Sequence, residues 1–134
     1  METEGRTVGY DVEFVQAAVE KGTFFPVAAD VAGKLLKKTV PFKEPAAVTQ
    51  FLAGLEGAKP GPAGAIDYLA KGLSYARFTV QTDRVHVENN LNCPELLRVY
   101  EKLRARYPAM LILDVQSGQL HDVTSYKEWW SKPL

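Results

Sequence analysis

The chain has 134 residues, of which 46% are hydrophobic and 24% are charged. These values are ordinary for a soluble globular protein, and the length suits one domain because two independent cores would be unusual at this size. Sixteen basic side chains balance sixteen acidic ones. The formal charge of zero argues against a general binder of nucleic acid or of an anionic membrane, because such proteins need a clearly basic face.

Cysteine content and the lack of long apolar segments indicate the compartment. Cys93 is the only cysteine, so no internal disulfide can form and a reducing environment is expected. The N-terminal residues METEGRTVGYDVEF lack a basic region followed by an apolar one, so no secretory signal is predicted. No apolar run approaches the ~18 residues that a membrane span requires. The sequence therefore predicts a cytoplasmic protein without a membrane segment, a cofactor or a structural metal.

The first half of the chain predicts strands and helices from its apolar periodicity. Gly57–Gly64 contains five Gly or Pro in eight residues and predicts a loop. Pro41 has no N–H to donate to a central strand, so its segment suits a sheet edge. The predicted elements are a half-buried strand over Arg6–Val15, helices over Thr23–Lys38, Glu44–Leu55 and Ala65–Gly72, and a short edge strand over Thr39–Phe42.

The second half predicts a hairpin, a helix, a buried strand and a final helix. The hairpin is YARFTVQTDRVHVENN, and the helix PELLRVYEKLRARY follows Asn92, which forms a predicted capping box with Glu95. Met110–Val115 is apolar at five positions of six, which is typical of a strand covered on both faces. The last helix spans Thr124–Trp130. We expect an α+β fold: one two-layer domain, with a mixed or antiparallel sheet of about five strands and helices mainly on one face.

Cys93 is the most suggestive residue for catalysis. A thiol at a helix N-terminus faces the positive end of the helix dipole, which lowers the thiol pKa. His86, on the second hairpin strand, could act as its base. The competing interpretation is that Cys93 is a small residue filling the first turn of a capped helix. Because no glycine-rich oxyanion turn accompanies it, no catalytic residue is assigned.

His121 and Asp122, with Asp114 on the preceding strand, form a second candidate cluster. A metal site needs several converging N or O donors, and a His-Asp pair supplies only the beginning of one. The spacing matches no zinc or calcium motif. We expect His121 and Asp122 to make turn and capping hydrogen bonds instead, and no metal site is assigned.

Charged side chains suggest two kinds of contact surface. Asp11, Glu13 and Glu88 lie on the polar faces of predicted strands, and they would form an acidic surface suited to a basic partner if those strands pair. A solvated strand face is the alternative. Basic residues recur at helical spacing in the main helix, but nearby glutamates and the missing interleaved aromatics argue against nucleic acid. The basic positions are Arg98, Lys102 and Arg106.

The tail SYKEWWSKPL carries adjacent tryptophans. Adjacent helical residues point about 100° apart, so Trp129 and Trp130 cannot both occupy the centre of one buried stripe. One of them is free to reach the surface, where tryptophan is a typical interface anchor. The predicted partner-binding residues are therefore Asp11, Glu13, Glu88, Trp129 and Trp130.

Residues 75–130 carry a resemblance to a known group of proteins. They comprise the hairpin, PELLRVYEKLRARYP and AMLILDVQSGQLHDVTSYKEWW. This arrangement resembles the small cytoplasmic immunity proteins of bacterial toxin–immunity systems, which are commonly single α+β domains that neutralise a toxin by binding it. The resemblance implies a protein partner, a cognate toxin, and inhibition by occlusion.

Other functions stay open at this point. One is a small enzyme or ligand-binding domain that uses Cys93, His86 or His121, which a deep pocket around any of them would favour. Another is an accessory subunit of a larger assembly. Homodimerisation through an edge strand is also compatible with the sequence. The balance of features favours a binding protein over an enzyme.

Overall fold

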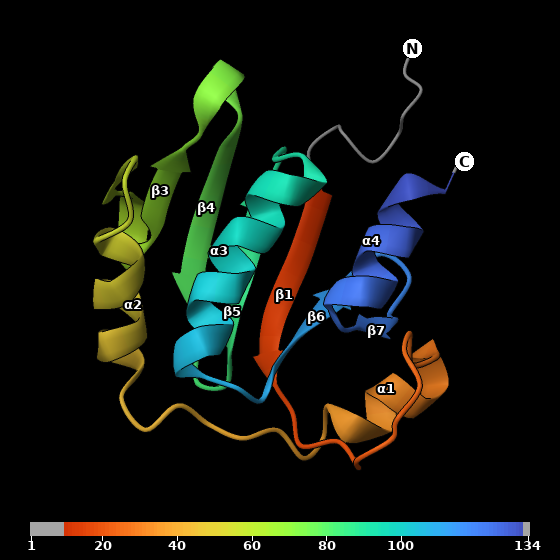
Figure 1. Ribbon diagram of the computed structural model, residues 1–134. Coiled ribbons are helices and arrows are strands. Elements are labelled where there is room, and N and C mark those ends of the chain that lie inside the picture. Colours follow the sequence, from red (N-terminus) through yellow and green to blue (C-terminus); the bar gives the residue numbers. More distant parts are fainter. Residues whose placement is uncertain (1–9, 133–134) are drawn as a thin grey trace.

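The computed structural model describes residues 10–132, and one open antiparallel sheet forms its centre (Figure 1). Within these residues the sheet has seven strands in the order β2-β3-β4-β5-β1-β6-β7. The strands are β1 (Tyr10–Gln16), β2 (Ala58–Pro60), β3 (Ile66–Leu69), β4 (Tyr75–Val80), β5 (Arg84–Asn89), β6 (Met110–Asp114) and β7 (Leu120–His121).

Four α-helices flank the sheet in the same part of the chain. Figure 1 shows α3 crossing the middle of the sheet, with α2 over the β2–β3 end and α4 over the β6–β7 end. The helices are α1 (Ala29–Leu35), α2 (Pro45–Ala53), α3 (Cys93–Arg106) and α4 (Val123–Ser131). The predicted α+β fold with helices mainly on one face is confirmed. The sheet is larger than expected because β2, β3 and β7 were not predicted as strands, although the predicted strand over Thr39–Phe42 is not part of it.

The main core lies between the sheet and the helices α2, α3 and α4. Alternate strand residues such as Val12 and Phe14 of β1 are fully buried there, because the side chains of a strand point to opposite faces in turn. The Tyr100 ring of α3 packs on Phe14 at a centroid distance of 5.3 Å, and its hydroxyl donates a 2.5 Å hydrogen bond to the Met110 carbonyl. This polar contact ties the central helix to β6 inside an apolar layer.

A smaller core covers only one end of the other face. Val15 of β1 and Leu111 and Leu113 of β6 point to this side, where they pack with Val27 and with Ala32 of α1. Among residues 10–132, no helix lies over the rest of this face, on β5, β4 and β3 (Figure 1). We call this part, together with the adjoining end of β1, the open face.

The segment Ala65–Gly72 is a strand, so the predicted helix there is wrong. Ile66 and Tyr68 are buried and alternate with more exposed residues, and β3 pairs antiparallel with β4 from Ile66–Phe78 to Leu69–Tyr75. A tight turn with positive φ at Gly72 (74°) and Leu73 (67°) then reverses the chain. Hydrogen bonds to β4, a contact between separate segments of the chain, outweigh the local helical spacing of these four residues.

The predicted helix over Thr23–Lys38 is shortened to α1. The residues before it are extended because Val27 exchanges two backbone hydrogen bonds with Leu120, at 2.7 Å and 3.1 Å. This bridge protects the outer edge of β7. The short edge strand predicted over Thr39–Phe42 is also wrong, because this segment makes only a single isolated bridge, from Thr39 to Ala17.

The proline- and glycine-rich segment Gly57–Gly64 contains the short edge strand β2, so it is not purely a loop. Gly57 is required at its start, because a Cβ there would lie 2.5 Å from the Leu69 carbonyl oxygen and the φ angle is +93°. Pro60 lies on the outermost strand, where a missing N–H costs no ladder hydrogen bond.

The remaining elements follow the prediction closely. The hairpin of β4 and β5 and the helix α3 are confirmed, and the Asn92 side chain caps α3 by accepting a 3.0 Å hydrogen bond from Glu95 N. Of the predicted strand Arg6–Val15, residues 6–9 lie outside the described part and the rest belongs to β1. Among residues 10–132, no helix combines the length and the apolar character needed to cross a membrane.

Candidate functional site

The open face is formed by every second residue of β1, β5, β4 and β3. The strand register places charged residues directly opposite one another on neighbouring strands. Their partners alternate in sign across most of the face, which stabilises cross-strand pairs. The row reads Asp67, Arg77, Glu88, Asp11.

Ion pairs fix one half of this face. Arg84 donates to Glu13 at 2.9 Å and to Asp83 at 2.8 Å, and these groups are only 15–20% exposed. The hydrogen bond from Arg84 holds the pKa of Asp83 below its usual value. Arg77 similarly donates to Asp67 at 2.7 Å and lowers the pKa of that carboxyl. These groups are therefore already satisfied inside the protein.

His86 lies between two carboxylates on the same face. Its Nδ1 is 2.9 Å from Glu13 Oε2, and its Nε2 is 3.3 Å from Asp11 Oδ2. The histidine thus fixes the orientation of both acids. Because His86 points to the open face and Cys93 begins a helix on the opposite face, the structure separates the pair that could have formed a thiol and its base.

Glu88 lies between Arg77 of β4 and Asp11 of β1 on the open face. Its side chain is exposed and, within residues 10–132, forms no ion pair within 4.0 Å, and the Asp11 side chain opposite it is 40% exposed. Two carboxylates facing one another destabilise a sheet slightly. A positive group from outside would relieve that repulsion. The structure thus brings together the predicted residues Asp11, Glu13 and Glu88.

An apolar patch adjoins this acidic pair. Leu69 and Tyr75 face each other across β3 and β4 and are 57% and 42% exposed, and Leu73 in the turn between them is 84% exposed. We call these three residues the apolar tip. Leu73 is a bulky residue held at positive φ, a conformation that costs roughly 1–2 kcal/mol. The sequence prediction missed this tip because it assigned the segment to a helix.

The tryptophans lie on the other side of the molecule. Trp129 packs against His121 and Tyr126, with ring centroids at 5.9 Å and 5.4 Å, and Trp130 lines a groove between α3 and α4. Both rings are half-buried. The five residues predicted to bind a partner are therefore divided between two surfaces, three acids on one and two tryptophans on the other.

Cys93 lines the same groove but is 6% exposed. Burial raises the pKa of its thiol, so the expected lowering by the helix dipole is outweighed. The competing interpretation, that Cys93 is a small residue filling the first helical turn, agrees with this buried environment. An activated nucleophile needs the opposite shift.

The His121 cluster is buried beneath α4. His121 Nδ1 is 2.9 Å from Ser125 Oγ, and Asp122 caps α4 by accepting from Ser125 N at 2.8 Å. Asp114 is also buried and accepts a 2.6 Å hydrogen bond from Ser117. Burial lowers the pKa of His121. In the described part of the chain, no group of three or more His, Cys, Asp or Glu side chains could hold a metal ion.

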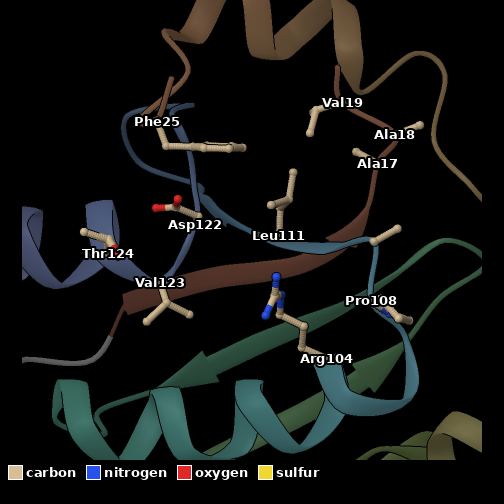
Figure 2. Close-up of a pocket in the computed structure, with 11 residues that line it drawn as sticks. Ala17, Ala18, Val19, Phe25, Arg104, Pro108, Leu111, Asp122, Val123 and Thr124 are labelled. Atoms are coloured by element: carbon tan, nitrogen blue, oxygen red, sulfur yellow. The ribbon is translucent and has the colours of Figure 1, made fainter. Parts of the chain in front are cut away.

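A cavity of about 540 Å³ opens between the start of β6, the C-terminal half of α3 and the start of α4. Figure 2 shows Phe25 extending over it, Leu111 at its base, and Arg104 reaching from α3 toward Leu111. Asp122 and Thr124 add polar atoms from the α4 side. Apolar walls with a few polar groups are typical of small-molecule sites. Neither histidine nor the cysteine lines this cavity.

Comparisons of the chain with protein-family models, with curated proteins and with solved structures found no match.

Proposed function

We propose that this protein binds a second protein through its open face and apolar tip, and that it acts as an immunity-type inhibitor that occludes a basic surface of its partner. The single observation that carries this proposal is the neighbouring carboxylates of exposed Glu88 and partly exposed Asp11, opposite one another on the uncovered half of the sheet. Electrostatic complementarity of this kind directs partner choice and accelerates association.

The charge balance of the open face favours a basic partner. Five carboxylates gather on it and at its adjoining turn, against three lysine or arginine side chains, which is an excess of two carboxylates over these cations. The carboxylates are Asp11, Glu13, Asp67, Asp83 and Glu88, and the basic residues are Lys59, Arg77 and Arg84.

The open face is too small to form a stable interface without the apolar tip. The four strands are four to seven residues long. With ~4.8 Å between strands and ~3.3 Å per residue, they cover roughly 19 Å by 20 Å, about 400 Å² in plan. A stable interface buries about 800 Å² on each partner, so the open face alone is small. The exposed Leu73, Leu69 and Tyr75 extend it and supply the apolar anchors that usually dominate binding energy.

Co-expression with proteins encoded beside it, followed by affinity measurement on the purified complex, tests this proposal. The double variant Asp11→Lys/Glu88→Lys should weaken the complex at least tenfold, because two attractive pairs become repulsive. A control variant, Glu20→Lys/Glu128→Lys, changes the net charge equally at two exposed positions outside the open face and should have little effect. Equal losses in both variants, or no complex at physiological salt, would contradict the proposal.

The cavity beneath Phe25 supports a second candidate function, binding of a small ligand with both charged and apolar parts. Arg104 forms no ion pair within 4.0 Å in residues 10–132, while Asp122 contributes a carboxylate nearby. A panel of amino acids and short-chain acids, screened by thermal shift on wild type and Arg104→Ala, tests this candidate. A stabilisation that the variant loses supports it, and no shift from any compound contradicts it.

Both candidates fit a reducing, cytoplasmic location, which the single cysteine predicts. An accessory subunit would use the same open face, and the co-expression experiment would reveal its assembly instead of a one-to-one inhibitor complex.

A further inference from the structure

A long apolar groove runs along the helical side of the molecule, away from the open face. It has a volume of about 860 Å³ and lies between α3 and α4. Its lining residues on α3 recur every three or four positions, so they form one continuous stripe. They are Cys93, Pro94, Leu97, Arg98, Glu101, Lys102 and Ala105, joined by Lys127 and Trp130 from α4.

The length of this stripe fits a helix better than a small molecule. Cys93 and Ala105 are twelve residues apart. At 1.5 Å per residue the groove therefore extends about 18 Å along α3, or more than three helical turns. The floor contains Leu97 and the half-buried ring of Trp130. Such a floor accepts apolar residues at positions i, i+3 or i+4 and i+7 of a bound helix.

The charges at the rim indicate the character of that helix. Arg98 and Lys102 are exposed on α3, and Lys127 is exposed on α4, so cations border the groove from both helices. Glu101 is the one carboxylate among the lining residues given above, which leaves an excess of two positive charges. Arg98 is partly engaged with Glu95 at 3.0 Å, but Lys102 and Lys127 make no ion pair within 4.0 Å in residues 10–132.

We propose that this groove binds an amphipathic helix with acidic flanks from another protein. The apolar side of the helix would lie on Leu97, Ala105 and Trp130, and its carboxylates would meet Lys102 and Lys127. This surface goes beyond the proposed inhibitory function, because it lies on the helical layer and recognises the opposite charge. The protein would then join a basic partner on one side to an acidic helix on the other.

A pair of designed peptides tests the inference on the intact protein. One labelled 16-residue helix carries leucines at i, i+3, i+4 and i+7 with glutamates elsewhere, and the other replaces each glutamate with lysine. Fluorescence anisotropy should show binding of the acidic peptide and at least tenfold weaker binding of the basic one. Absence of binding by the acidic peptide at 1 mM, or a preference for the basic one, overturns the proposal.

Three variants, one of them a control, separate charge from shape. Lys102→Glu/Lys127→Glu should weaken the acidic peptide at least tenfold and reverse the preference, whereas Lys34→Glu/Lys37→Glu on and beside α1 makes the same charge change outside the groove and should have little effect. Ala105→Trp fills the groove at an exposed position and should weaken both peptides without changing charge. Equal effects of the two charge variants overturn the proposal, as would a wild-type homodimer that Ala105→Trp converts to monomer, which assigns the groove to a second copy. Loss of peptide binding leaves the Asp11/Glu88 experiment unaffected, so the two proposals fail separately.

Discussion

The two faces of the sheet are made from alternate residues of the same strands, yet they have opposite properties. On β5, Val85 and Val87 are fully buried under the helices, whereas Glu88 is exposed on the open face. Burial of apolar area provides most of the folding free energy, and exposed pairs of charges provide little. The helix-covered face therefore determines the fold, while side chains of the open face can change at small cost in stability, which leaves that face available for recognition.

The largest test of this difference uses two neighbouring residues of β4. Phe78 is fully buried, and Thr79 is exposed on the open face. Phe78→Ala should lower the free energy of unfolding by about 3–5 kcal/mol because it leaves a cavity in the core. Thr79→Ala should change it by less than about 0.5 kcal/mol. Urea unfolding followed by tryptophan fluorescence measures both changes. Comparable losses of unfolding free energy would show that the two faces contribute equally to stability.

A second test compares two arginines of the open face that differ in burial. Arg84 pairs with two partly buried carboxylates, and Arg77 pairs with Asp67 while 41% exposed. Arg84→Ala should cost about 2 kcal/mol, since hydrogen bonds to charged groups contribute roughly 1.5–3 kcal/mol. Arg77→Ala should cost less than about 1 kcal/mol, as exposed ion pairs do. Chemical denaturation at low salt compares them, and a larger loss in Arg77→Ala would refute this ranking.

The Arg84 network also predicts an acid response. Because the pKa of Asp83 is lowered from 3.8 by Arg84, the unfolded chain binds more protons than the folded chain as the pH falls through that range. The stabilisation is therefore complete above about pH 5 and is lost progressively below pH 4. Unfolding midpoints of wild type and Arg84→Ala should converge as the pH is lowered from 5 to 3. A constant difference would exclude this coupling.

A third test concerns the covered face, where His121 is fully buried. Burial lowers its pKa below 6.5, so protonation favours the unfolded chain, and stability should fall as the pH decreases below about 6.5. The slope for one group is at most about 1.4 kcal/mol per pH unit. His121→Phe keeps a ring beside Tyr126 and Trp129 and should remove this contribution between pH 6.5 and 5. An unchanged slope in thermal unfolding would assign it to another group.

The smallest expected effect on stability is at the apolar tip. Leu73→Gly removes the strain of a bulky residue at a φ of 67°, and this gain is partly offset by the greater freedom of glycine in the unfolded chain. We expect stabilisation of about 0.5 kcal/mol, because Leu73 is 84% exposed and loses few contacts. The same variant should weaken the proposed partner complex. Calorimetry and binding measured together check this opposition, and a destabilised variant with full affinity would contradict it.

Sequence patterns predicted the helix-covered face well because that face has strong periodicity. The hairpin shows alternation, α3 shows a helical stripe and β6 shows a continuous apolar run. Pro94 and Pro108 limit the helix at both ends. The capping role of Asn92 was readable for the same reason, since local chemistry determines it. The grouping of Asp11, Glu13 and Glu88 followed from the correct assumption that their strands pair.

The sequence predictions fail mainly where pairing with a strand far away in the sequence determines the structure. The residues IDYL are too few to distinguish a strand from a helical turn, and only the register with β4 makes them a strand. The sequence therefore did not predict the exposed apolar tip or the positive φ of Leu73. Cys93 and His86 are seven positions apart in sequence, but the sheet lies between them, and no periodicity of one segment reveals that.

The two ends of the sheet have a consequence for how this protein can associate. One edge is the three-residue strand β2, which ends in Pro60, and at the other edge Val27 already bonds to Leu120 of the two-residue strand β7. An incoming chain finds too short a row of free N–H and C=O groups to add a strand at either end. In the described part of the chain, such short and partly covered edges disfavour aggregation by strand addition. The broad surfaces of the two layers are then the larger areas open to other molecules.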